Sequence, residues 1–186
     1  MGVAVRRETR MSVAEYQAWV EAKPDDERWE LLDGEPELMS PAIWRHQRIV
    51  STLVRKLDEL AERRGCSALP GLAVLSAAMD DFAPIPDVVV TCGPQRADGY
   101  TRDPLLLAEV LSPSTMTNDL GRKTAFYRTV ASLKTFLIVY QDEARVEVWT
   151  RSDGWSMRGL GREDAIDLPE LGGSLAVSDL YDRVEF

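Results

Sequence analysis

The stretch LLLAEVL (residues 105–111) decides the fold, because Glu109 is its one residue that is not apolar. The segment IPDVVV (85–90) has the same character, with Asp87 as its one charged residue. A strand with one face in water alternates polar and apolar residues, whereas a strand covered on both faces is apolar throughout. Both segments are therefore predicted to be central strands of a sheet with helices on either side.

The first part of the chain predicts a short helix, a hairpin and a long helix. Ser12 followed by Glu15 forms a capping box that opens a helix over 12–21. The pair Asp33-Gly34, between apolar segments, is typical of a two-residue hairpin turn. After Pro41, apolar residues recur at steps of three and four up to position 61, which predicts a long amphipathic helix closed by Gly65.

The remaining segments predict strands around a second helix. Strands are expected at 66–69, 73–77, 136–140, 145–150 and 155–160, a helix at 118–130 capped by Thr117 or Asn118, and a short helix near Leu180. Helices that alternate with apolar strands in this way predict an α/β fold, in which a central mixed β-sheet is flanked by two main helices. The length of 186 residues fits a single domain over 1–186.

Composition and charge exclude several classes of protein. No apolar run approaches the roughly 20 residues of a membrane helix, and the first residues do not form a secretory signal. Cys66 and Cys92 are expected to be buried thiols in a reducing cytoplasm rather than a disulfide. With His46 as the one histidine, a zinc site is not expected. The net charge of −9 opposes non-specific nucleic-acid binding, although a cleft that is locally basic or filled by a metal would still permit a nuclease.

Asp87 and Glu109 are the candidate functional residues. An isolated carboxylate among apolar strands costs several kcal/mol, and two of them on neighbouring strands would also repel each other. A shared divalent cation relieves both costs, and carboxylate oxygens suit Mg²⁺ or Mn²⁺. Lys123 falls on the same predicted inward face of its helix as Leu120 and Tyr127, so its ammonium group is expected to point toward the two carboxylates.

Several ordered motifs resemble the Uma2 family (DUF820), part of the PD-(D/E)XK restriction-endonuclease-like superfamily. They are WELLDGE (29–35), MSP (39–41) with RHQRI (45–49), Pro86-Asp87, and EVLSPST (109–115) with DLGRK (119–123) and Tyr127. Together they cover roughly residues 16–181. The resemblance implies a restriction-endonuclease-like core with an N-terminal hairpin.

The resemblance also implies roles for individual residues. Asp87, Glu109 and the backbone carbonyl of Val110 would coordinate Mg²⁺ or Mn²⁺. Lys123 would replace the superfamily lysine, whose usual position two residues after the second acid is Leu111 in this chain.

Glu30 would supply the additional acid near the N-terminus, and His46 would line the same cleft. The implied reaction is endonuclease-like, metal-dependent hydrolysis of phosphodiester bonds, with DNA favoured over RNA.

For each of these residues a purely structural role remains an alternative to the catalytic one. Asp87 could accept hydrogen bonds from backbone amides, and Glu109 could form a purely structural ion pair with Lys123. Lys123 could instead extend to solvent, Glu30 could be an exposed hairpin residue, and His46 could pack or cap at the start of its helix.

Two departures from the family pattern also bear on function. The chain has Ile85 before Pro-Asp where the pattern has glutamine, and Lys134-Thr135-Phe136 where it has Glu-Tyr-Trp. With the acidic net charge, the second departure leaves open a catalytically silent scaffold or regulatory homo-oligomer. A hydrolase of smaller phosphoesters is a further alternative. A homodimer is expected through exposed strand edges near Trp149 and Trp155.

Overall fold

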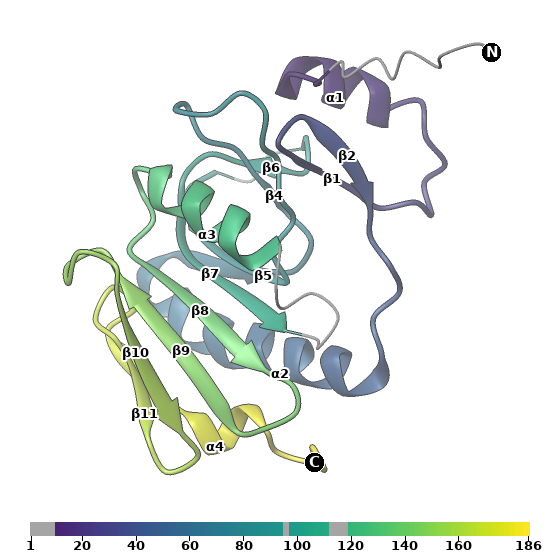
Figure 1. Ribbon diagram of the computed structural model, residues 1–186. Coiled ribbons are helices and arrows are strands. Elements are labelled where there is room, and N and C mark those ends of the chain that lie inside the picture. Colours follow the sequence, from purple (N-terminus) through teal and green to yellow (C-terminus); the bar gives the residue numbers. More distant parts are fainter. Residues whose placement is uncertain (1–9, 95–96, 112–118) are drawn as a thin grey trace.

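A computed structural model describes residues 10–94, 97–111 and 119–186 (Figure 1). Its centre is a six-stranded sheet in the order β10-β9-β8-β7-β5-β3. In this sheet β7 and β8 run parallel, and the other neighbouring pairs are antiparallel. The predicted mixed sheet is confirmed. Its strands are β3 (Cys66–Leu69), β5 (Val88–Cys92), β7 (Pro104–Leu111), β8 (Thr135–Tyr140), β9 (Arg145–Thr150) and β10 (Ser156–Gly161).

Two helices cover the opposite faces of the sheet, with α3 (Asp119–Thr129) in front and α2 (Trp44–Ala61) behind it in Figure 1. Leu53 and Leu57 of α2 pack in one core cluster, whereas Phe126 and Tyr127 of α3 pack in another. Since both faces are covered, β5 and β7 are apolar on both sides, as the sequence predicted. Among the described residues, no helix is both long enough and apolar enough to cross a membrane.

The N-terminal elements follow their local sequence signals. Helix α1 (Val13–Val20) begins at the capping box of Ser12 and Glu15. Strands β1 (Trp29–Leu32) and β2 (Glu35–Leu38) form the predicted hairpin, whose turn has positive φ angles of 53° at Asp33 and 74° at Gly34. Gly34 is also required for space, because a Cβ there would lie 2.6 Å from the Cβ of Arg10. The 3₁₀ turn η1 (Glu62–Arg64) extends α2, and Gly65 closes it in the left-handed conformation.

Some short elements differ from the predictions. The hairpin β11 (Ala165–Leu168) and β12 (Gly173–Ala176) was not predicted, although α4 (Val177–Leu180) beside it was. The strand predicted at 73–77 is limited to β4 (Ala73–Val74), which pairs with β6 (Tyr100–Thr101). Residues 85–87 precede β5, so Asp87 lies just before a strand and not within one.

The prediction of two free thiols is wrong, because Cys66 and Cys92 form a disulfide. Strands β3 and β5 pair so that these two residues lie directly opposite each other, with Cα atoms 4.1 Å apart. A separation of 26 residues gave no sign that the two strands are neighbours. The sequence argument for a reducing cytoplasm depended on free thiols and therefore loses its basis.

Candidate active site

The register of two strands brings Asp87 and Glu109 together. Val88 of β5 pairs with Ala108 of β7 in antiparallel orientation, so the next residues outward, Asp87 and Glu109, lie side by side. Glu109 projects to the face that α3 covers, because side chains alternate along a strand and Leu107 and Leu111 pack there. The side chains of Asp87 and Glu109 are only 19% and 12% exposed. The structure thus places two partly desolvated carboxylates on adjacent segments.

Asp87 is held by a backbone amide and a histidine. Its Oδ2 accepts a hydrogen bond of 2.7 Å from the amide of Val110 and lies 3.3 Å from Nε2 of His46. His46 is the third residue of α2, and its side chain is 13% exposed. The helix cap, Ile43, makes no side-chain hydrogen bond. The imidazole of His46, in the first turn of α2, therefore contacts Asp87 and does not cap the helix.

Lys123 connects two acidic residues from different parts of the chain. Its Nζ lies 2.9 Å from Oε2 of Glu30 and 3.4 Å from Oε1 of Glu109. The side chains of Lys123 and Glu30 are only 11% and 9% exposed, so the interpretations that placed either residue in solvent are wrong. Glu30 also accepts a 3.1 Å hydrogen bond from the amide of Ile85. The hairpin, the Pro-Asp segment and α3 therefore meet at one lysine.

Burial and neighbouring charges change the protonation of Glu109. Desolvation raises the pKa of Glu109 from 4.5 to about 7, and repulsion by Asp87 and Glu30 acts in the same direction. Lys123 and the hydroxyl of Tyr127, which donates a 2.5 Å hydrogen bond to Oε1, partly oppose the rise. The site therefore holds more negative charge than its one lysine compensates.

The basic residues of the site favour their protonated forms. Burial alone would lower the pKa of Lys123, but attraction to Glu109 and Glu30 raises it above its ordinary value. Burial likewise acts to lower the pKa of His46, but the hydrogen bond to Asp87 and its charge more than compensate, so the pKa is raised. Lys123 is consequently a permanent cation beside Glu109 at neutral pH.

The donor set suits a hard divalent cation completed by water. Among the described residues, no group of three or more His, Cys, Asp or Glu side chains could form a metal cage. Mg²⁺ commonly uses only one or two carboxylates and keeps several water molecules. Asp87 and Glu109 are two such carboxylates on adjacent segments. The raised pKa of Glu109 also indicates that a positive charge there would be favourable.

Two contacts in or beside the candidate site were not predicted from the sequence. Tyr127 was placed on the inward face of α3, but its hydrogen bond to Glu109 was not predicted. Arg122 of α3 contacts the N-terminal hairpin. Its Nη1 lies 3.3 Å from Asp33 and its Nη2 lies 3.0 Å from Glu37. These ion pairs join α3 to the hairpin that carries Glu30.

Part of the predicted site lies outside the described residues. This holds for the connection 112–115, for the proposed caps Thr117 and Asn118, and for the side chain of Leu120.

Comparison with known proteins identifies the family. Residues 13–178 match the sequence pattern of the Uma2 family, which is described as "Putative restriction endonuclease". The chain belongs to the Uma2 family. The Uma2 match spans the N-terminal helix, the hairpin, both main helices and the whole central sheet.

Relatives and a solved structure agree with this assignment. The Uma2 protein is 26% identical over 181 residues to "Uncharacterized protein slr1290" of Synechocystis sp., covering 95% of this chain and 94% of that protein. It is 31% identical over 146 residues to "Uncharacterized protein sll1609" of the same organism, covering 75% and 82%. It also resembles the crystal structure of "a putative nuclease belonging to DUF820" from Anabaena variabilis, with a TM-score of 0.75 and 16% identity over 94% and 99% of the two chains. The predicted nuclease-like α/β fold is confirmed.

Proposed function

We propose that this Uma2 protein is a metal-dependent nuclease that hydrolyses phosphodiester bonds in nucleic acid. The observation that carries the proposal is the arrangement of Asp87 beside Glu109, with the ammonium group of Lys123 3.4 Å from Glu109. A buried ion pair alone rarely stabilises a protein more than apolar residues would. Two carboxylates, a lysine and a raised carboxyl pKa in one site are instead typical of catalysis.

The residues have distinct proposed roles. Asp87, Glu109 and the carbonyl of Val110 would hold Mg²⁺ or Mn²⁺. Such an ion, when bound, lowers the pKa of a coordinated water and neutralises charge on the phosphate. Lys123 would donate a hydrogen bond to the attacking water or to a phosphate oxygen, because its raised pKa keeps it protonated.

Glu30, Tyr127 and His46 would position these groups. Glu30 fixes the ammonium group of Lys123, Tyr127 donates to Glu109, and His46 contacts Asp87. The homodimer stays a prediction. The edge strand β10 and its mostly exposed side chains offer a place for a second copy to pair.

A substrate panel tests the proposed function. The protein is incubated with single-stranded and double-stranded DNA, with RNA and with nucleoside phosphodiesters, in the presence of Mg²⁺, Mn²⁺ or a chelator. We expect metal-dependent cleavage of polynucleotides, with DNA preferred. Cleavage of small diesters alone would support the hydrolase of smaller phosphoesters, which the net charge of −9 favours. No metal-dependent cleavage in any mixture would contradict catalysis and support the scaffold.

Metal affinity is expected to depend on pH through Glu109. Because the pKa of Glu109 is raised to about 7, a cation must displace a proton from it below that pH. Affinity for Mn²⁺ should therefore rise about tenfold per pH unit below about pH 7 and level off above it. Calorimetry in buffers of different ionisation enthalpy should detect release of about one proton near pH 6 and little near pH 8.

Two variants distinguish the contribution of Glu109 to proton release from that of other carboxylates on the protein. Glu109→Gln should remove the part of the proton release that comes from Glu109 and weaken Mn²⁺ binding, whereas Glu143→Gln, at a side chain that is 58% exposed, should leave both unchanged. Affinity that is independent of pH in the unaltered protein would contradict the role of Glu109.

A further inference from the structure

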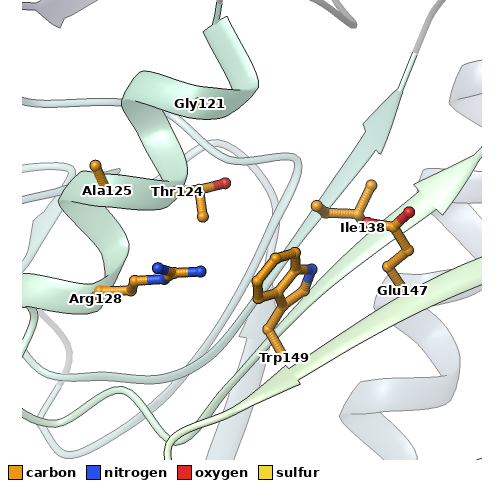
Figure 2. A pocket seen from close by; sticks show the side chains of 7 residues that line it. All are labelled: Gly121, Thr124, Ala125, Arg128, Ile138, Glu147 and Trp149. Carbon is orange, nitrogen blue, oxygen red and sulfur yellow. The ribbon is translucent and has the colours of Figure 1, made fainter. Parts of the chain in front are cut away.

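An open pocket that the proposed catalytic site does not use lies between α3 and the strands β8 and β9 (Figure 2). Its volume is about 320 Å³, at the lower end of the range for small-molecule sites. It is lined by Gly121, Thr124, Ala125, Arg128, Ile138, Glu147 and Trp149.

Strand register places this pocket in line with the catalytic carboxylates. Glu109 of β7 pairs with Ile138 of β8, and Ile138 pairs with Glu147 of β9. Glu109, Ile138 and Glu147 therefore form one row across the face that α3 covers, and Asp87 lies beside Glu109 at the end of this row. Neighbouring strands are about 4.8 Å apart, so Glu147 lies roughly 10 Å from Glu109. A nucleic-acid strand whose phosphate lies at Glu109 could reach the pocket with an adjacent nucleotide.

The pocket presents a hydrogen-bond acceptor beside an unused donor. Glu147 is 8% exposed, and its Oε1 receives hydrogen bonds from the hydroxyl of Tyr140 at 2.7 Å and from Nη2 of Arg145 at 3.0 Å. Within the described residues its Oε2 receives none. The buried indole Nε1 of Trp149 has no partner in that same part of the chain. In Figure 2 this nitrogen is on the side of the ring that faces Glu147. An unpaired buried donor is costly unless a ligand uses it.

The walls of the pocket favour a flat aromatic ring. Trp149 stacks on Phe136, with ring centroids 5.4 Å apart and planes inclined by 10°. The guanidinium of Arg128 lies 5.0 Å from the centroid of the indole, and its side chain is exposed and therefore free to move aside. Because the indole N–H lies in the plane of its ring, a base that accepts it would lie at the edge of Trp149, and the guanidinium of Arg128 is the group on which such a base could stack.

The pocket lining holds one guanidinium, Arg128, and one carboxylate, Glu147, and the end at Glu147 favours a neutral hydrogen-bond donor over a phosphate. The nearly buried carboxylate of Glu147 would repel an anion, but it can accept a hydrogen bond from a ring N–H or an amino group. Each nucleobase carries such a donor next to an acceptor on its pairing edge. The acceptor would receive the indole N–H of Trp149.

We infer that this pocket receives an unpaired nucleobase from the strand whose phosphodiester lies at Asp87 and Glu109. The inference deepens the proposed nuclease function and rests on it for the identity of that strand. A base must leave its partner to enter the pocket, and opening an intact duplex costs free energy. Single-stranded or frayed segments are therefore the favoured substrate.

Titration of the protein with nucleosides tests the inference without any cleavage. The indole N–H resonances are recorded by ¹H–¹⁵N correlation NMR, and the signal of Trp149 is assigned with Trp149→Phe. Adenosine, cytidine, guanosine and uridine are added in turn, with ribose 5-phosphate as the ligand that lacks a base. We expect at least one nucleoside to move the Trp149 signal downfield, because its N–H gains an acceptor, while the signal of the exposed Trp44 stays in place.

Glu147→Gln should weaken this nucleoside binding about tenfold or more, because the charged acceptor is lost. Glutamine keeps an oxygen that can accept from Tyr140 and Arg145, so the variant should still fold. Glu143→Gln, whose site lies outside the pocket, serves as the matched control and should bind like the unaltered protein.

The possible outcomes distinguish the inference about the pocket from the proposed nuclease function. A Trp149 signal that no nucleoside moves, or that ribose 5-phosphate moves equally, overturns the inference even if the protein cleaves DNA. Equal affinity in Glu147→Gln also overturns it. A base-dependent shift that Glu147→Gln weakens supports the pocket, even if no metal-dependent cleavage is found.

Discussion

Asp87→Asn is expected to reduce metal-dependent cleavage roughly a thousandfold, a loss in the range found when one charge-stabilising group is removed from an active site. The substitution removes one of the two carboxylate ligands proposed for the cation and leaves Glu109 to hold it with the carbonyl of Val110. Asparagine keeps a side-chain oxygen that can accept the 2.7 Å hydrogen bond from the amide of Val110. The fold should therefore survive, which alanine would not guarantee. Initial rates under single-turnover conditions, with Mg²⁺ and with Mn²⁺, provide the measurement.

Asp142→Asn is the matched control for this variant. Asp142 pairs with Arg45 at 3.3 Å near the start of α2, but its side chain is 53% exposed. Its substitution should change the cleavage rate by less than a factor of about three, since exposed pairs contribute little. Cleavage by Asp87→Asn at the unaltered rate would remove Asp87 from the catalytic site and with it the proposed metal pair.

Lys123→Met is expected to lower the free energy of unfolding by about 3–5 kcal/mol at neutral pH, the range for breaking a buried ion pair by removing one partner. Methionine has a similar length and fills the space, so the loss reports the missing charge rather than a cavity. Glu30 and Glu109 would remain buried without their shared cation. Urea denaturation followed by circular dichroism measures the difference. The variant should also lose cleavage.

The pH dependence of this loss distinguishes charge from packing. The pKa of Glu109 is raised from 4.5 to about 7, so the folded protein holds the proton more tightly than the unfolded chain does. The stability that this protonated form contributes is present at low pH and is lost as the pH rises from 4.5 to about 7. Without Lys123 the pKa of Glu109 should rise further, because the positive charge of the lysine lowers that pKa. The destabilisation by Lys123→Met should therefore be larger near pH 8 than near pH 5.5.

A control lysine and a double variant complete this experiment. Lys56→Met removes a pair with Asp179 whose side chains are 25% and 44% exposed, and it should cost no more than about 1 kcal/mol. Adding Glu30→Gln to Lys123→Met should recover part of the stability. A loss that is the same at both pH values would mean that Lys123 acts through packing alone.

Local sequence signals were sufficient to predict most of the fold. The apolar stripe of α2 and the turn at Asp33-Gly34 each specify one backbone conformation without help from the rest of the chain. The hairpin of β11 and β12 was missed because its four-residue strands show no period and, unlike β1 and β2, are not joined by a two-residue Asp-Gly turn. Such strands form because Ile166 and Leu175 are buried in the core cluster beneath α2, which is a tertiary effect.

The sequence predicted those residues of the candidate site that are charged and lie in apolar segments. Asp87, Glu109 and Lys123 were conspicuous for that reason, and the structure places them together. Contacts that depend on how the elements are arranged in space could not be predicted from the sequence. The position of Glu147 in the same row and the Cys66–Cys92 bond require knowledge of which strands are neighbours, and the hydrogen bond from Tyr127 to Glu109 requires knowledge of how α3 packs on β7.

The cystine between Cys66 and Cys92 has a topological consequence for Asp87. It makes residues 66–92 a closed covalent ring, and Asp87 is a member of that ring. A protease that cuts the backbone once inside the ring would open the polypeptide without releasing either piece. After a cut between Cys66 and Asp87, the carboxylate would remain attached through Val88 to β5, and the bridge at Cys92 would still join β5 to Cys66 of β3.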